Sequence, residues 1–188
     1  MLLTARLWFR QLLAIPFTEA SVQANRGVLQ NRNPGADVFA NDLIVTANGG
    51  QLQAGWNTEL EIQGVASGSG QLNIREDSRT VVLNNTGNTF SGNIVLDGVT
   101  SRLSVATLES GSYNGVISGA GTLTITDALN LEGDNTITGL TTITSSGILG
   151  GDGSIDGVYR KEERRHPEGN KPRPKKSKKD RQAKLKKR

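Results

Sequence analysis

The chain has 188 residues, no cysteine and one histidine, His166, so its composition excludes disulfide bonds and metal sites built from cysteine or several histidines. Residues 159–188 hold 15 Lys+Arg and 4 Asp+Glu, a charge of +11. The whole chain has 22 Lys+Arg and 18 Asp+Glu, so residues 1–158 hold 7 Lys+Arg and 14 Asp+Glu, a charge of −7. The basic character therefore belongs to the last thirty residues and is not a property of the fold.

Residues 1–24 open with an apolar stretch that Arg6 and Arg10 interrupt. Its longest uncharged apolar run, residues 12–17, is far shorter than the roughly 20 residues that cross a bilayer. Residues 22–24 supply the small side chains of a signal-peptidase site. The pattern fits a cleaved secretory signal, a short amphipathic N-terminal helix or a misassigned start.

Residues 25–37 are rich in turn formers, with Pro34-Gly35 as the strongest signal, and we expect an irregular lead-in there. From residue 38 to residue 158 there is no proline, which suits interior strands because proline removes a ladder donor. Short β-branched or alternating runs recur in this region, with clusters of Gly, Asn, Asp or Ser between most of them. The pattern predicts an all-β body with strands of roughly 3–6 residues.

A sequence repeat sets the expected architecture. Residues 64–74 (GVASGSGQLNI) match residues 115–125 (GVISGAGTLTI) at seven of eleven positions, at an offset of 51. Residues 88–92 (NTFSG) return as residues 135–139 (NTITG) at an offset of 47, and residues 147–155 form a partial third copy of the glycine-rich motif. Repeats of this kind are typical of solenoids.

A coil of three strands and three turns takes about 24 residues, so the repeat fits two coils of a parallel β-helix. In that register Leu72 and Leu123 belong to one side of the molecule, and Asn88 and Asn135 form side-chain ladders along the stack. A narrow core also agrees with the low aromatic content of 4%. The alternative is an antiparallel β-sandwich, which does not require a repeat.

The repeated unit resembles the passenger-associated, or autotransporter-associated, β-strand repeat of bacterial surface proteins. The motifs that carry the resemblance are GAGTLTI at 119–125, GDNTITG at 133–139, TTI at 141–143 and GIL at 147–149, with an earlier copy over residues 68–96. Ile137 stands where that family usually has an aromatic residue, and one residue is missing before Asn88. The match covers about residues 64–158.

The resemblance implies a right-handed β-helical passenger that is carried to the cell surface, with a repeat linked to secretion and folding of the passenger. Complete members of that family end in a membrane β-barrel, and the basic C-terminus here has no alternating strands of about ten residues. We therefore expect a fragment, a truncated reading frame or a stand-alone relative.

Few residues suggest chemistry. Glu59 and Glu61 share one side of a strand, as the carboxylates of a glycosidase could, but such pairs are usually solvated. Glu76-Asp77 and Asp134 read as turn and corner residues. Residues 150–156 (GGDGSID) differ from a calcium-binding nonapeptide at Ile155, so a glycine corner is the better interpretation. We predict no catalytic residue, no cofactor and no metal ligand.

Residues 159–188 hold only three apolar side chains, so we predict a disordered basic tail. Its lysine runs would attract nucleic acid or an anionic surface, or they are a solvated run or a shifted reading frame.

For the whole chain we predict a non-enzymatic passenger fragment with an adhesion or spacer role, extracellular or on a bacterial cell surface. The alternatives are a scaffold for the binding tail and a carbohydrate-active β-helix. Expected partners are a surface or glycan ligand and, through the tail alone, nucleic acid or an anionic surface, but no small-molecule substrate. Uncapped ends predict end-to-end self-association, and aggregation of residues 38–158 alone.

Overall fold

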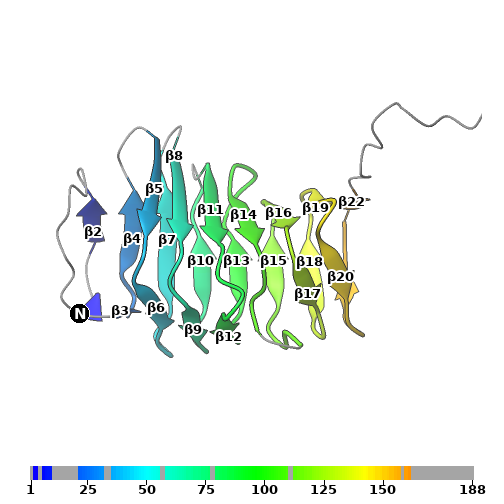
Figure 1. The fold of residues 1–188 in the computed structure, drawn as a ribbon, viewed down its shortest axis with the longest axis horizontal. Coiled ribbons are helices and arrows are strands. Elements are labelled where there is room, and N and C mark those ends of the chain that lie inside the picture. Colours follow the sequence, from blue (N-terminus) through cyan, green and yellow to red (C-terminus); the bar gives the residue numbers. More distant parts are fainter. Residues whose placement is uncertain are drawn as a thin grey trace, which may run out of the picture.

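The computed structural model describes residues 2–3, 6–9, 21–31, 35–55, 58–76, 79–109, 112–157 and 159–161. These residues form parallel strands that wind into a solenoid and include no helix (Figure 1). Every strand pair within the sheets is parallel, and each strand is bonded to strands one coil before or after it. The parallel β-helix is therefore confirmed, and the antiparallel sandwich is excluded.

Three long sheets and a fourth, two-stranded one make up the coil. The first sheet contains β1 (Leu2–Leu3), β3 (Ser21–Ala24), β6 (Asp42–Val45), β9 (Ala66–Gly68) and β12 (Thr89–Phe90). The second contains β2 (Arg6–Phe9), β4 (Val28–Asn31), β7 (Gly50–Ala54), β10 (Leu72–Ile74), β13 (Ile94–Leu96), β15 (Ile117–Gly119), β18 (Asp134–Ile137) and β21 (Ser154–Ile155). The third contains β5 (Gly35–Phe39), β8 (Thr58–Ile62), β11 (Thr80–Leu83), β14 (Arg102–Val105), β16 (Thr122–Ile125), β19 (Thr141–Ile143) and β22 (Tyr159–Lys161). The fourth pairs β17 (Ala128–Asn130) with β20 (Ile148–Gly150), which follow the third sheet in the later coils.

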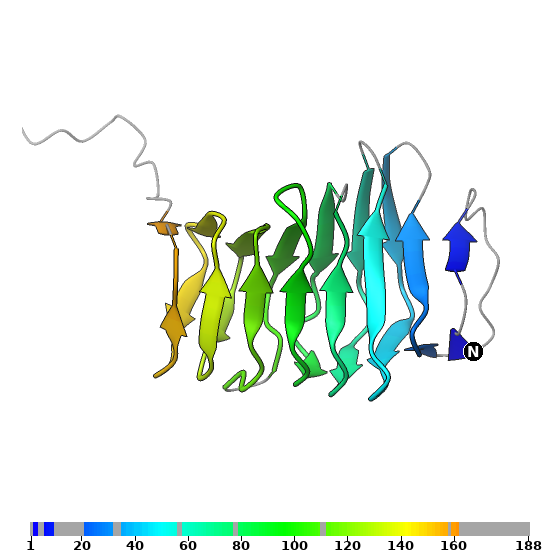
Figure 2. The same ribbon diagram turned by 180° about the vertical axis from the view of Figure 1, so that it is seen from behind.

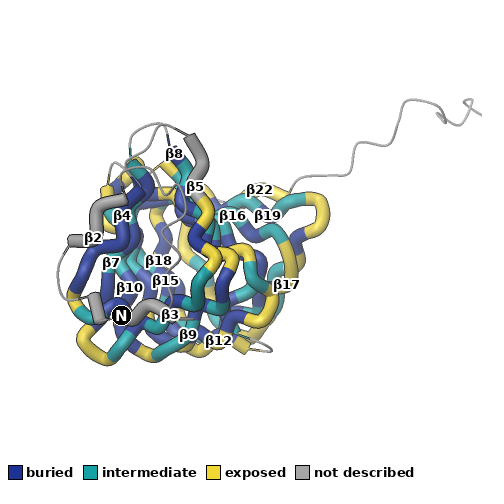
Figure 3. The backbone as a smooth tube through the Cα atoms, turned by 60° about the vertical axis from the view of Figure 1, so that its left-hand side comes forward, coloured by how far each residue is buried: buried dark blue, intermediate teal, exposed yellow. Residues whose placement is uncertain are grey.

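The coil is right-handed. In Figure 2 the strands of the second sheet point upward on the near side while the chain advances from right to left. Alternate residues of each strand face inward, as the buried–intermediate alternation of β7, β8 and β11 shows. The inward side chains of all faces form one hydrophobic core. Figure 3 marks the buried residues along the coil in dark blue.

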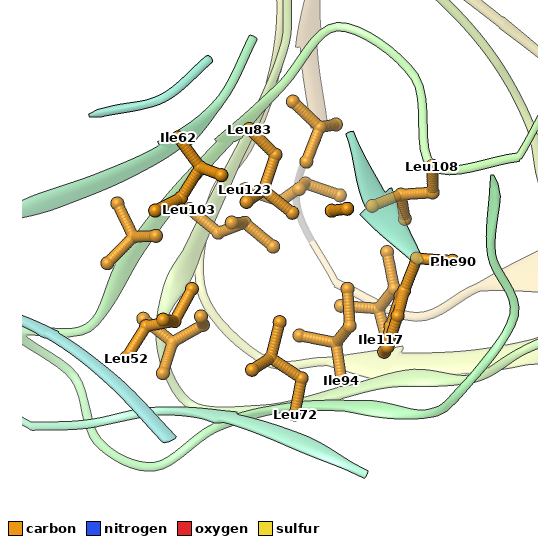
Figure 4. Close-up of a cluster of buried hydrophobic side chains, with 14 of the residues drawn as sticks. Leu52, Ile62, Leu72, Leu83, Phe90, Ile94, Leu103, Leu108, Ile117 and Leu123 are labelled. Atoms are coloured by element: carbon orange, nitrogen blue, oxygen red, sulfur yellow. The ribbon is translucent and has the colours of Figure 1, made fainter. Parts of the chain in front are cut away.

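The core is layered by coil. Leu52, Leu72, Ile94 and Ile117 come from the second sheet, and Ile62, Leu83, Leu103 and Leu123 from the third (Figure 4). Phe90 and Leu108 lie on the remaining side of the core, away from these two sheets. The core also takes Phe39 and Tyr113, so the interior holds more aromatic volume than the predicted aliphatic filling.

The predicted register of the repeat is wrong. Leu52, Ile74 and Leu96 are stacked in consecutive coils, so one coil takes 22 residues, and an offset of 51 exceeds two coils by several residues. Leu72 consequently pairs with Ile94 in the second sheet, whereas Leu123 pairs with Leu103 in the third. Figure 4 shows Leu72 and Leu123 on opposite sides of the core. The error came from assuming turns that are longer than those formed.

The repeat instead encodes a corner between two faces. Gly68, Gly119 and Gly151 hold the same place in its three copies and have φ values of +102°, +110° and +101°. A Cβ on any of them would collide with the carbonyl oxygen of the residue below, which for Gly119 is Leu96. Copy one turns from the first sheet to the second, and copy two from the second to the third. One local motif thus serves at different corners.

The predicted domain assignments differ from the structure at three places. The irregular lead-in over residues 25–37 contains β4 and the start of β5, which pair with β7 and β8. Here Val28 and Leu29 gain burial in the stack, which outweighs the turn-forming composition around them. In residues 1–24 the described parts are strands β1, β2 and β3, not a helix. Whether this segment is a cleaved signal stays a prediction.

The solenoid continues three residues past its predicted end. β22 pairs with β19 and places Tyr159, Arg160 and Lys161 in the third sheet, inside the region predicted to be disordered. The remaining tail, including His166, lies outside the described residues, so the predictions of disorder and of binding by the tail stay open.

The C-terminal coil leaves its core side incompletely covered. Leu149 and Ile155 are only partly buried against the core. Ile148, beside Leu149 on β20, lies on the outer face of the strand and is 62% exposed. β20 pairs with β17 on one edge, and no described strand pairs with its other edge. An edge of this kind can accept a strand from another chain.

Substitution of Gly119 by alanine tests the corner. Because the left-handed φ and the Leu96 carbonyl both oppose a Cβ, Gly119→Ala should lower the free energy of unfolding by about 2–3 kcal/mol. Urea denaturation measures the change. The control is Gly87→Ala, in an exposed turn, where the atom nearest to the added Cβ is the side-chain Oδ1 of Asn85 at 3.1 Å. The stability of this variant should stay close to that of the wild type. Equal stability of the two variants would contradict the corner assignment.

Substitution of Ile148 by lysine tests end-to-end association. A charge on this free edge disfavours strand addition, so Ile148→Lys should shift the chain toward monomer in sedimentation velocity. Val99→Lys is the control, because Val99 is 71% exposed in a turn between β13 and β14, away from the end. A monomeric wild type, or equal effects of both lysines, argues against association through this edge.

Candidate functional site

Asn88 and Asn135 each tie their own coil to the coils on both sides. Asn88 is fully buried, accepts from the Ala66 backbone N–H at 2.8 Å and donates to the Thr107 carbonyl at 2.9 Å. Asn135 accepts from the Ile117 N–H at 2.8 Å and donates to the Ser154 carbonyl at 3.0 Å. Their amides therefore bond along the stack as predicted, but to backbone groups and at different faces rather than in one common ladder.

Tyr113 enters the core from the segment between β14 and β15. Its hydroxyl donates to the Gly92 carbonyl, and its ring lies where a Cβ on Gly115 would collide with it. Burial, reinforced by the negative charge of Glu109, raises the pKa of Tyr113 well above its ordinary value of 10.0. This residue fills the side of the core where the first sheet has ended.

The carboxylate pair Glu59 and Glu61 lies as predicted on the outward side of β8. Glu61 Oε1 accepts from Asn84 Nδ2 at 2.9 Å and from Gln63 Nε2 at 3.2 Å. In the third sheet the register partners of Glu61 are Val38 in the preceding coil and Val82 in the following coil. These contacts fit a hydrogen-bonded surface carboxylate in the sheet.

The other acidic candidates lie at turns and strand ends. Glu76 is in an exposed turn, whereas its neighbour Asp77 lies outside the described residues. Asp134 starts β18 and accepts from Ser154 Oγ at 2.9 Å. Gly151, in the motif similar to a calcium nonapeptide, forms the third corner. The described residues contain no group of three His, Cys, Asp or Glu side chains placed to hold a metal ion.

The most organised polar surface is an amide-rich face on the second sheet, which sequence reasoning missed. It comprises outward side chains of β7 and β10 together with residues that flank β10 and β13: Gln51, Gln53, Gln71, Asn73, Arg75 and Asp97. Successive coils bring these residues together, because Gln51 is the register partner of Asn73 and Arg75 follows the Leu52–Ile74 pair. We call this surface the amide face.

Hydrogen bonds fix the side chains of the amide face. Gln71 Nε2 donates to Asn73 Oδ1 at 2.7 Å, and Asn73 Nδ2 donates to Asp97 Oδ1 at 3.2 Å. Arg75 Nη1 donates to Gln51 Oε1 at 2.8 Å. The network links three consecutive coils and gives long side chains a common arrangement before any ligand arrives.

A shallow groove of about 220 Å³ lies at another corner, lined by Thr86, Thr107, Asp127, Ala128 and Asn130. Thr107 Oγ1 already donates to the Glu109 carbonyl at 3.2 Å, and Asp127 Oδ1 accepts from the Ala128 N–H at 2.9 Å. The volume is below the roughly 300–1,000 Å³ of pockets that enclose small ligands. The groove therefore offers less to a ligand than the amide face.

A signal for the amide face was present in the alternation of the sequence. Amide residues stand two apart in Gln51-Leu-Gln53 and Gln71-Leu-Asn73, with the buried leucine between them. Alternation of this kind sends both amides outward on one side of a strand. The alternation does not predict which strands pair with each other, because the pairing depends on the number of residues in each coil.

No family model, curated protein or solved structure matches the chain. The described residues contain no helix that could span a membrane.

Alkaline titration tests the role of Tyr113. The unfolded tyrosine ionises near pH 10.0 while the folded one resists ionisation, so this stabilisation is complete below that pH and is lost as the pH rises above it. Tyr113→Phe should cost about 1–3 kcal/mol at neutral pH, since it leaves the Gly92 carbonyl without its donor. Above pH 10 the variant should lose less stability than wild type does, as measured by urea denaturation across pH. Parallel alkaline losses in both proteins would show that Tyr113 is not the responsible group.

Proposed function

We propose that the chain is a structural, non-enzymatic passenger segment of a secreted or cell-surface protein similar to autotransporters, with an adhesion or spacer role. The observation that carries the proposal is the uninterrupted parallel ladder of the second sheet, which runs through eight strands from β2 to β21. A ladder of this kind makes a stiff rod in which each coil is the template for the next.

Coil-by-coil growth supports a role in export. Residues that pair across coils lie close in sequence, as Ile74 and Leu96 do, so a coil folds when about 22 further residues have emerged. The corner glycines and the buried asparagines act between neighbouring coils in the same way. A chain that emerges from a membrane with one terminus leading would thus fold coil after coil from that terminus. This suits the passenger role that the repeat resemblance implies.

An export assay tests the proposal. The full chain, fused at its C-terminus to a phosphatase that is active only outside the cytoplasm, is produced in a bacterial host. Phosphatase activity is expected for the wild-type chain and should be lost in the matched variant Leu12→Asp/Leu13→Asp, which interrupts the apolar run of residues 12–17. An inactive wild-type fusion that is present at normal amounts in the cytoplasm would contradict the secreted role.

A further inference from the structure

The amide face keeps unused hydrogen-bonding capacity after its internal network is made. Gln51 Nε2 and Gln71 Oε1 make no hydrogen bond to any described residue, and the same holds for Asp97 Oδ2. Gln71 and Asp97 are exposed, and Gln51 is half-buried. Donors and acceptors thus stand side by side on a surface whose backbone is fixed by the sheet.

The amide face has balanced charge. Arg75 is its one cation and Asp97 its one anion among the six residues, and the other four are neutral amides. A surface of this kind has no net attraction for phosphate, sulfate or an acidic peptide. Its chemistry suits a neutral ligand that both donates and accepts hydrogen bonds, which is the property of a polyol.

The polar groups of the amide face extend along the rod over three coils. Gln51 and Asn73 occupy matching positions in adjacent coils, about 4.8 Å apart, and Gln53 and Arg75 form the parallel row, which Asp97 continues in the next coil. The Gln51–Asn73 row ends at Val28 on one side and at Val95 on the other. A chain of several sugar units reaches more of these groups than a single small molecule does, so weak contacts add along it.

We propose that the amide face binds a neutral polysaccharide, with Gln51, Gln71 and Asp97 as its central contacts. This inference extends the adhesion role proposed above by naming the ligand class and the surface. It rests on that role for its biological meaning, but the binding itself is a property of the folded chain and is independent of export. A failed export assay and a failed binding assay therefore point to different errors.

Nuclear magnetic resonance of the uniformly ¹⁵N-labelled full chain tests the proposal. The chain is titrated with three neutral oligosaccharides, cellohexaose, laminarihexaose and mannohexaose. At least one should give saturable shifts of the backbone amides of β7, β10 and β13. Gln51→Ala/Gln71→Ala should weaken that binding about tenfold or more, because two ligand hydrogen bonds are lost. The matched control Ser104→Ala/Thr124→Ala changes a register pair on the outer face of the third sheet and should bind as wild type does.

Three results would overturn the proposal. The first is the absence of saturable shifts with all three sugars. The second is a set of shifts centred on the groove around Thr107 and Asp127 instead of the amide face. The third is binding that disappears on addition of salt, because a neutral ligand on a charge-balanced face is insensitive to screening while binding by the basic tail is not. Binding that persists in salt and weakens only in the Gln51/Gln71 variant supports it.

Discussion

The close approach of each coil to the carbonyl oxygens of the coil before it is the constraint on which the rest of the structure depends. Parallel strands can stack continuously only if the corners between faces leave room for the backbone of the neighbouring coil. At Gly68, Gly119 and Gly151, which lie at different corners, the backbone meets this condition with a positive φ and no side chain. Asn88 and Asn135 then satisfy the backbone groups that the corners leave inside.

Much of the fold was predictable because strand alternation and turn residues are local signals. The runs around Leu72, Val81 and Ile94 are strands as expected, and the sequence repeat correctly indicated a parallel solenoid. The register was not predictable, since it depends on the number of residues in each coil. That number falls from 22 between Ile74 and Leu96 to 18 between Ile125 and Ile143, which no local pattern announces.

The candidate site was less predictable than the fold. Sequence reasoning weighed carboxylates such as Glu59 and Glu61, because reactive groups are conspicuous one residue at a time. The amide face is different in kind, since none of its residues is unusual alone and only the stacking of Gln51 on Asn73 makes it a surface. Tyr113 was missed for a similar reason: its buried place follows from the end of the first sheet at β12, which is a property of the whole stack.

A pair of engineered disulfides tests the stacking register most directly, because the chain has no cysteine of its own. Asn73 and Val95 are register partners in adjacent coils, so Asn73→Cys/Val95→Cys should oxidise to an intramolecular disulfide, at a Cα separation of about 4.8 Å. Asn73→Cys/Thr124→Cys joins positions that match in the sequence repeat but lie on different sheets, and it should stay reduced. A disulfide in the second pair, or none in the first, would contradict the account.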